Sequence, residues 1–342
     1  MDDRAALACR GRRRFLQGNL GVAGLGLLAG CGQVSLPWQR PKVYRVGVLM
    51  ESATDPAEAR FHRALRLGLR EHGWIEGENL LIEHRWGEGS AARIPEIAAD
   101  LVRLPVDLIV ARGSIYTQAA RQATSTIPIV FVGHADPINT GHVASLARPG
   151  GNATGNAVLQ TELAPKWLQL LTAVVPGVTR IAVIWHPGTP SHTPALQALE
   201  ESARTLHVQL QAVGARTAAD FEGAFAEMAR EGAQAVVVLG TPFFYNERLR
   251  WSELALMHRL PAMYSAREAV EAGALMSYSP NLEALWRSAA VFVDRILKGA
   301  RPADLPVEQA TTFEVAINHK TARALGLTIP QEVLQQATEV IQ

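Results

Sequence analysis

The stretch ARPGGNATGN, residues 147–156, lies near the middle of the chain and separates two similar halves. Its glycines and its proline are residues that interrupt regular secondary structure. Before it, RVGVLM (45–50) opens a series of alternating strand and helix patterns, and after it RIAVIW (180–185) opens a second series. The sequence therefore predicts two α/β lobes that meet near this stretch, with a cleft between them.

The two halves repeat each other in order. VDLIVARGS (106–114) corresponds to AQAVVVLGT (233–241), and IPIVF (127–131) corresponds to LPAMY (260–264). Short apolar runs rich in β-branched residues are typical of buried parallel strands, and the segments between them have helical spacing. This alternation predicts a parallel sheet in each lobe with helices on both faces.

Some element boundaries follow from local signals. Asp55 and Pro56 predict the start of a helix, with the aspartate as cap and the proline at the first position. Asn281 is expected to cap a long helix that ends at Gly299. A helix is expected over 246–258, and the last expected elements are a strand at 312–317 and a helix at 319–325.

Composition and charge limit the function classes. Of 342 residues, 48% are apolar and 19% are charged, which is typical of a folded globular protein. The net charge is +1, and removal of the arginine-rich first thirty residues would leave about −2. This balance argues against nucleic acid as a partner.

The N-terminus reads as an export signal followed by a lipid attachment site. RRRFLQ (12–17) resembles the twin-arginine pattern, with Gly11 where Ser or Thr is usual, and an apolar run covers 20–30. That run is shorter than the roughly 20 residues that span a bilayer. LAGC (28–31) matches a bacterial lipobox with Cys31 as the lipidated residue; the alternative is a chance cysteine in a small-residue cleavage region.

The body of the chain contains no cysteine, since Cys9 and Cys31 are the two in the sequence. Disulfides, thiol catalysis and cysteine metal sites are therefore excluded there. The sequence contains no Gly-x-Ser-x-Gly, Walker A or His-Glu-x-x-His motif, and its histidines show no metal-ligand spacing. Hence neither an enzyme nor a bound cofactor or metal is expected.

Candidate ligand contacts follow the carboxyl ends of the predicted strands, where open parallel sheets bind ligands. The candidate residues are Ser52, Gly113, Ser114, Tyr116, His134, Asp136, Trp185, His186, Thr241, Tyr264, Glu268 and Ser277. Gly113 and Ser114 have the most weight, because a glycine before a helix N-terminus lets an anion approach free N–H groups.

Each of these candidates has a simpler structural interpretation. Ser114 could merely cap its own helix, and Asp136-Pro137 is slightly better explained as a capped turn. Trp185, Tyr264 and Tyr116, together with Tyr278, could wall an apolar ligand or pack in the core. For this aromatic set the two interpretations are about equal.

Several long motifs together resemble one family, the ABC-transporter substrate-binding proteins related to tryptophan- and tyrosine-binding proteins. The segments that carry this resemblance are PIVF (128–131), DP (136–137), GHVASLARPGGNATG (141–155), GALMSYSPN (273–281), DLPVEQ (304–309) and ALGLTIP (324–330). The resemblance extends from about Val43 to the C-terminus.

The resemblance implies a type I periplasmic-binding-protein fold: two Rossmann-like lobes, with a ligand enclosed between them and hinge crossings near 154–158, 276–280 and 307–312. The expected division is 1–30 export signal, 31–42 tether, 43–155 plus 279–308 lobe 1, and 156–278 plus 309–342 lobe 2. Gly113, Ser114, Asp136, Tyr264 and Ser277 match cleft-lining positions of such proteins.

Two positions depart from the family pattern. His186 stands where many members have asparagine, and Thr241 stands where many have an acidic residue. An acid there could pair with a ligand ammonium, and threonine cannot supply that charge.

The expected function is that of a lipid-anchored periplasmic receptor, a monomer. It would bind a small solute, amino-acid-like or aromatic, by hinge closure and deliver it to the permease and ATPase of an ABC importer. The alternative is a ligand-sensing module coupled to a membrane sensor kinase or receptor. A cytosolic repressor would need a DNA-binding headpiece, and the lipobox occupies that place.

Overall fold

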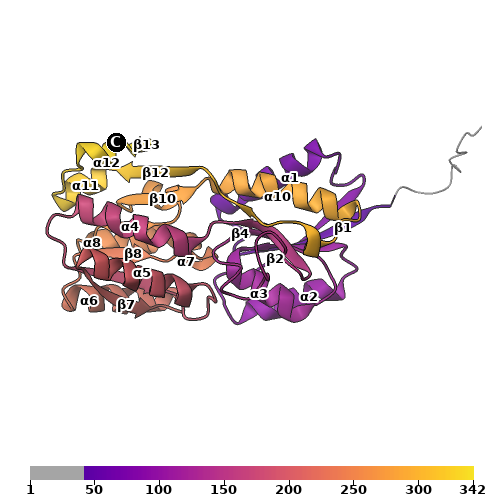
Figure 1. The fold of residues 1–342 in the computed structure, drawn as a ribbon, viewed down its shortest axis with the longest axis horizontal. Coiled ribbons are helices and arrows are strands. Elements are labelled where there is room, and N and C mark those ends of the chain that lie inside the picture. The colour runs from indigo at the N-terminus through magenta and orange to yellow at the C-terminus, as the bar shows by residue number, and fades with distance from the viewer. Residues whose placement is uncertain (1–41) are drawn as a thin grey trace, which may run out of the picture. The chain divides into compact units, whose positions relative to one another are not determined.

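Two sheets organise residues 42–342, the part of the chain that this computed structural model describes (Figure 1). Both sheets belong to one compact unit. The twin-arginine pattern, the apolar run and Cys31 lie outside the described residues. None of the helices described at 42–342 combines the length and apolarity needed to cross a bilayer.

The sheet of lobe 1 is parallel throughout and has the order β11-β5-β4-β3-β1-β2. Its strands are β1 (Tyr44–Met50), β2 (Leu80–Trp86), β3 (Leu108–Arg112), β4 (Ile129–His134), β5 (Ala153–Ala157) and β11 (Glu308–Gln309). Its helices are α1 (Pro56–Glu71), α2 (Arg93–Arg103), α3 (Gly113–Ala123) and α10 (Leu282–Leu297).

Side chains of this sheet alternate between two cores. Val46 and Val48 pack in the core that contains α1 and α10, whereas Leu49 packs with α2 and α3. The period of two residues sends successive side chains to opposite faces, so both faces need a helical cover. This is why the strand sequence is apolar at nearly every position.

The sheet of lobe 2 has the order β13-β12-β10-β9-β8-β6-β7. Its strands are β6 (Arg180–Trp185), β7 (Gln209–Gly214), β8 (Ala235–Val238), β9 (Ala262–Tyr264), β10 (Met276–Pro280), β12 (Phe313–Asn318) and β13 (Glu339–Ile341). Its helices are α4 (Gln160–Val174), α5 (His192–Leu206), α6 (Phe221–Arg230), α7 (Pro242–Asn246), α8 (Arg248–Met257), α9 (Arg267–Glu271), α11 (His319–Leu325) and α12 (Gln331–Leu334).

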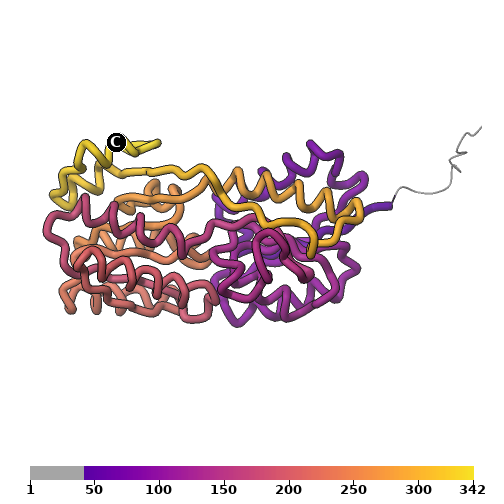
Figure 2. The backbone as a smooth tube through the Cα atoms, in the orientation of Figure 1, coloured from indigo at the N-terminus to yellow at the C-terminus, as the bar shows by residue number. Residues whose placement is uncertain are grey.

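The chain passes between the sheets at β5 to α4, at β10 to α10 and at β11 to β12, and Figure 2 follows these segments. They lie close to the hinge crossings expected from the sequence. The predicted class, two α/β lobes joined by a hinge of three segments, is confirmed. The residue boundaries assigned to the lobes stay a prediction.

Local expectations were partly correct. Asp55 caps α1 by accepting from the N–H of Ala57, and Asn281 caps α10 by accepting from the N–H of Ala284. The helix expected over 246–258 is α8 (Arg248–Met257), and a separate short helix that was not predicted, α7 (Pro242–Asn246), precedes it. The short elements α12 and β13 were not predicted, and neither was β5 within the glycine-rich stretch.

The expectation of uniformly parallel sheets is wrong for one strand pair, because β12 runs antiparallel to β10. The physical reason is the path of the chain. Neighbouring parallel strands need a crossover connection, and the alternating strand and helix pattern of each lobe supplies one. The strand β12 enters from lobe 1 after β11, so that constraint does not apply to it.

Gly155 is the position in the hinge region where only glycine fits. Its φ is +147°, and a Cβ there would lie 2.0 Å from the carbonyl oxygen of Phe131 in β4. We expect Gly155→Ala to lower the free energy of unfolding by about 2 kcal/mol or more. Gly151→Ala, where a Cβ meets nothing within 4 Å, is the control. Urea unfolding measures both, and equal midpoints would contradict this close approach.

Candidate ligand-binding site

A cavity of about 70 Å³ lies between the two lobes. Its lining comes from the carboxyl ends of strands in both sheets and from α10, as expected for open parallel sheets. The lining residues are Arg112, Gly113, Ser114, Val132, Gly133, Ala135, Val158, Gln160, Thr189, Ser191, Gly240, Thr241, Pro242, Tyr245, Tyr264, Ser265, Ala266, Leu282, Leu285 and Trp286.

The lobe 1 wall begins where β3 turns into α3. Gly113 has a φ of +62°, which a glycine adopts without strain. A Cβ at this position would lie 3.6 Å from the ring of Pro242 in the opposite lobe. The first N–H groups of α3 have no partner within the helix, and their partial positive charge favours an anionic group.

Ser114 belongs to a buried chain of hydrogen bonds behind this wall. The N–H of Asp136 donates to Nδ1 of His134 (3.1 Å), so that nitrogen is an acceptor and Nε2 carries the proton. Nε2 of His134 donates to Nδ1 of His142 (2.6 Å), and His142 donates to Oε1 of Gln118. The Ser114 hydroxyl lies 3.3 Å from Nδ1 of His134 and accepts from the N–H of Ala135. This chain fixes the position of Ser114 at the cavity.

The buried polar side chains that lobe 2 contributes to the cavity fall into two sets. The first set is already paired: Gln160 exchanges two hydrogen bonds with Gly240, and the Tyr264 hydroxyl donates to the carbonyl of Thr241. The second set has no partner in the described part of the chain. It consists of the Ser191 and Tyr245 hydroxyls, whose residues are 1% and 2% exposed.

An unpaired buried hydroxyl costs about 1–3 kcal/mol, so native structures rarely keep one without a reason. Both of these residues line the cavity. A ligand that hydrogen-bonds to Ser191 and Tyr245 would remove this cost. The remaining wall is apolar, and Trp286 on α10 is its largest member, stacked on Phe61 at 5.9 Å.

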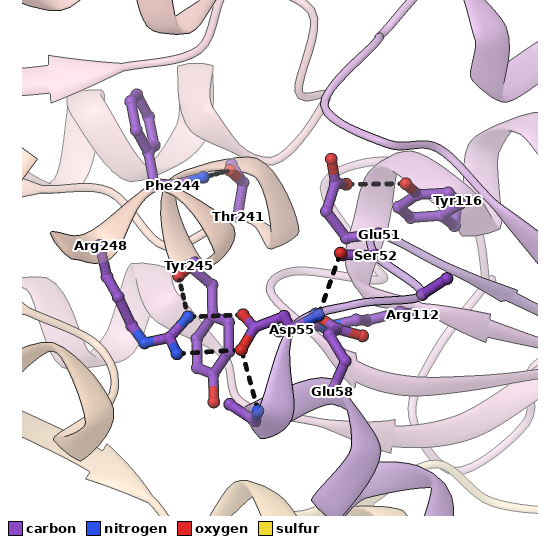
Figure 3. A network of polar contacts seen from close by, with 12 residues as sticks. Glu51, Ser52, Asp55, Glu58, Arg112, Tyr116, Thr241, Phe244, Tyr245 and Arg248 are labelled. Atoms are coloured by element: carbon purple, nitrogen blue, oxygen red, sulfur yellow. Dashed lines mark hydrogen bonds and ion pairs between the residues drawn. The ribbon is translucent and has the colours of Figure 1, made fainter. Parts of the chain in front are cut away.

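An ion pair joins the lobes beside the cavity (Figure 3). Nη1 and Nη2 of Arg248 donate to the two carboxylate oxygens of Asp55 at 2.6 and 3.0 Å. Both side chains are largely buried. Burial alone would raise the pKa of Asp55, but the hydrogen bonds from Arg248 and from the N–H of Ala57 outweigh it, so the pKa is lowered.

Tyr245 lies between guanidinium groups from both lobes. Arg112 of lobe 1 lies 4.6 Å from the ring centroid and Arg248 of lobe 2 lies 4.9 Å from it. Arg112 is itself paired with the buried carboxylate of Glu58. Cation–π contacts of this kind contribute about 0.5–2 kcal/mol each. The ring therefore connects the lobes (Figure 3), and the same residue belongs to the cavity lining.

Of the residues predicted from strand ends, Gly113, Ser114, Thr241 and Tyr264 line this cavity. His134 lies directly behind Ser114 in the hydrogen-bond chain. The side chain of Thr241 caps α7 by accepting from the N–H of Phe244 (3.0 Å).

Other predicted residues have structural partners instead. Ser52 accepts from the N–H groups of Thr54 and Asp55 just before α1. The Tyr116 hydroxyl donates to Glu51 (2.7 Å) inside lobe 1. Asp136 accepts from Asn139 and from the Thr161 hydroxyl, which agrees with the alternative interpretation of a capped turn.

The last four predicted residues do not belong to the lining of this cavity. His186 belongs to a separate crevice of about 10 Å³, which shares Thr189 and Thr241 with the main cavity. Trp185 is half-buried at the end of β6, whereas Glu268 and Ser277 are buried. As ligand contacts, these residues stay predictions.

The sequence analysis did not select Arg112, Ser191, Tyr245 or Trp286. Arg112 directly precedes Gly113 and could have been included by the strand-end rule. Ser191 belongs to the loop after β6, and Tyr245 and Trp286 lie on helices. No strand-end signal identifies side chains that reach the cavity from helices.

A cavity enclosed by two hinged α/β lobes and lined from both defines a solute-binding protein of the type I periplasmic class. Residues 46–341 match the sequence profile of a family described as ABC transporter substrate binding protein, and the chain belongs to this family. The resemblance inferred from the motifs is confirmed. This family consists of substrate-binding proteins rather than enzymes.

Individual proteins agree with this assignment. A tyrosine-binding protein of Clostridioides difficile (strain R20291) is 26% identical over 321 residues, which cover 90% of each chain. A conserved domain protein from Vibrio cholerae is 28% identical with a TM-score of 0.81, covering 87% of this chain and all of that one. An ABC domain from Streptococcus pneumonia in complex with L-Trp is 25% identical, also with a TM-score of 0.81, covering 88% of this chain and all of the other.

The hydrogen-bond chain behind Ser114 predicts a pH effect on stability. Burial is the main cause that lowers the pKa of His142 to about 4, from an ordinary 6.5. Since the folded protein binds this proton less readily than the unfolded chain, stability is full above pH 6.5 and falls toward pH 4. The shift at His142 alone should lower the free energy of unfolding by about 3 kcal/mol between neutral pH and pH 4.

In His142→Gln the amide oxygen can still accept from His134. We expect the free energy of unfolding of this variant to fall by about 3 kcal/mol less than that of the wild type between pH 7 and pH 4. Urea unfolding at several pH values measures the difference. Parallel pH profiles of the two proteins would contradict a neutral, buried His142.

Proposed function

We propose that this protein is the extracytoplasmic solute receptor of an ABC importer. It binds a small solute in the cavity between its lobes, closes around it and presents it to the permease, whose transport is driven by the ATPase. The observation that carries this proposal is the pair of buried, unpartnered hydroxyls of Ser191 and Tyr245 at a cavity lined by both lobes. Amino acids are among the candidate solutes, given the tyrosine and L-Trp named for two relatives.

Closure follows from contacts that both lobes must supply. The Asp55–Arg248 ion pair and the Arg112–Tyr245 contact require the lobes to be together. A ligand that contacts Ser114 on one side and Ser191 or Tyr245 on the other satisfies both sets only when the lobes are closed. Binding then shifts the population toward the closed form, which the permease recognises.

The N-terminal motifs supply the proposed location. Export by the signal at 1–30 and lipidation of Cys31 would hold the receptor at the outer side of the cytoplasmic membrane. A single lipid chain binds a membrane only marginally, whereas two or more chains on the cysteine give stable attachment. The tether at 31–42 would then leave the monomeric receptor free to meet the permease.

A thermal-shift screen of the mature chain from Gly32 tests this function. The panel contains amino acids, purines, sugars and small carboxylates, and a refolding step removes any ligand carried through purification. A solute at about 100 times its Kd adds roughly 2.7 kcal/mol to stability. We expect at least one solute to raise Tm and to decrease the radius of gyration in X-ray scattering. No response to any class would contradict the receptor function.

Tyr245→Phe separates a ligand contact from a structural one. Because the Tyr245 hydroxyl has no partner in the described structure, its loss should leave Tm unchanged or slightly raised. Affinity for the strongest solute of the screen should fall about tenfold, measured by calorimetry. Tyr264→Phe is the matched control, since its hydroxyl bonds to Thr241 and its loss should lower Tm. Unchanged affinity in Tyr245→Phe would remove Tyr245 from the site.

Asp55→Asn tests the contribution of the interlobe ion pair. Asparagine keeps an oxygen that caps α1 but removes the charge that binds Arg248. We expect roughly 10-fold weaker solute binding, because a charge-assisted hydrogen bond contributes about 1.5–3 kcal/mol to the closed form. Arg250→Gln is the control, since Arg250 pairs with Glu222 on the exposed surface of lobe 2. Equal affinities in the two variants would contradict a role for the ion pair in closure.

A further inference from the structure

No acidic side chain of residues 42–342 lines the cavity. Its one ionised lining residue is Arg112, and the remaining polar members are hydroxyls, one amide and backbone groups. Ser191 and Tyr245 carry the buried lining hydroxyls that lack a partner among the described residues, and both can donate to a ligand oxygen.

The carboxylates nearest to the lining have partners of their own. Asp55 forms an ion pair with Arg248, and Glu58 forms one with Arg112. The negative charge of each carboxylate is therefore neutralised within the protein. Glu51 accepts from the Tyr116 hydroxyl and from the N–H of Gly89. Asp136 accepts hydrogen bonds from Asn139 in its own turn and from the Thr161 hydroxyl in α4.

Glu268 is the remaining acidic residue of this region. One of its oxygens has no partner in the described structure, but the residue does not line the cavity. Burial raises the pKa of Glu268, which weakens it as a source of negative charge. An ammonium group in the cavity would therefore be buried without a counter-charge, at a cost of several kcal/mol.

The helix dipoles at the cavity favour an anionic ligand group, whereas the lining disfavours a cationic one. Four long helices begin at the cavity, α3 at Gly113, α4 at Gln160, α5 after Ser191 and α10 at Leu282. Each N-terminus carries roughly half a positive charge. Together with the two unpartnered hydroxyls, these N-termini favour an anionic group on the ligand.

Resting on the proposed function, we propose that the solute is a compact carboxylate that carries no ammonium group. Its carboxylate binds between the N-terminus of α3 and the hydroxyls of Ser191 and Tyr245, and its apolar part contacts Val158, Leu285 and Trp286. At roughly 10–15 Å³ per water, the cavity of about 70 Å³ has room for about five waters. This size favours a short or branched chain.

Matched pairs of ligands that differ in the ammonium group test this inference by calorimetry on the mature chain. The pairs are L-alanine and propanoate, L-valine and 3-methylbutanoate, and L-leucine and 4-methylpentanoate. We expect at least one deaminated acid to bind, at least tenfold more tightly than its amino acid. Tighter binding of the amino acids would overturn the inference, as would an absence of binding by all six compounds.

These outcomes are distinct from a failure of the proposed function. Preference for the amino acids would leave a solute receptor with a different ligand class. The receptor function fails only if the wider screen of amino acids, purines, sugars and carboxylates also gives no response.

A substitution at Thr241 should reverse the preference for the deaminated acid over its amino acid. Thr241 lines the cavity and caps α7, and Asp and Asn are both good caps. We expect Thr241→Asp to weaken binding of the deaminated acid and strengthen that of its amino acid, so that their affinity ratio changes at least tenfold. Thr241→Asn, the neutral control of similar shape, should leave the ratio unchanged. Equal ratios in two variants with wild-type Tm would contradict the electrostatic basis of the inference.

Discussion

The ion pair between Asp55 and Arg248 is the contact on which the arrangement of the two lobes depends. Both side chains are largely buried, and each is positioned by its own lobe: Asp55 caps α1, and Arg248 also donates to the carbonyl of Tyr245. Burying two charges is costly, and the bidentate geometry together with these extra hydrogen bonds offsets the cost. The pair is therefore specific for one relative position of the lobes. Neither residue touches the cavity, so the pair favours closure irrespective of what the cavity holds.

The cavity adds selectivity to this ligand-independent contact. Most of its polar groups are committed to partners in the protein, which fixes the positions of Ser114, Gln160 and Tyr264 before a ligand arrives. Groups fixed in advance lose little conformational freedom on binding. The unpartnered hydroxyls then decide which functional groups a ligand must bring. With the exception of Tyr245, the residues that hold the lobes together are thus different from those that select the ligand.

The sequence predicted the parts of this arrangement that follow from local pattern. Buried parallel strands are continuous apolar runs, so the two lobes and the strand ends at Gly113, Ser114, Thr241 and Tyr264 could be located without a structure. The antiparallel direction of β12 could not, because it depends on the route of the chain through the other lobe. Tyr245 and Trp286 depend on how helices rotate and pack, and Arg248 is 193 residues away from Asp55 along the chain. Such contacts leave no signal in the spacing of neighbouring residues.

Tyr245 combines the two roles that the rest of the site keeps apart. Its ring lies between Arg112 and Arg248, the residue lines the cavity, and its hydroxyl has no partner among the described residues. The contacts of this one side chain therefore depend both on whether the lobes are closed and on whether the cavity holds a ligand. Thermodynamic reciprocity then requires that whatever the ligand adds to closure through this residue, closure adds to ligand affinity by the same factor. A solute that does not hydrogen-bond to the hydroxyl would bind without this increase in affinity. The lobes would therefore stay closed for a shorter time in an empty receptor, or in one that holds such a solute, than in a receptor with its proper ligand.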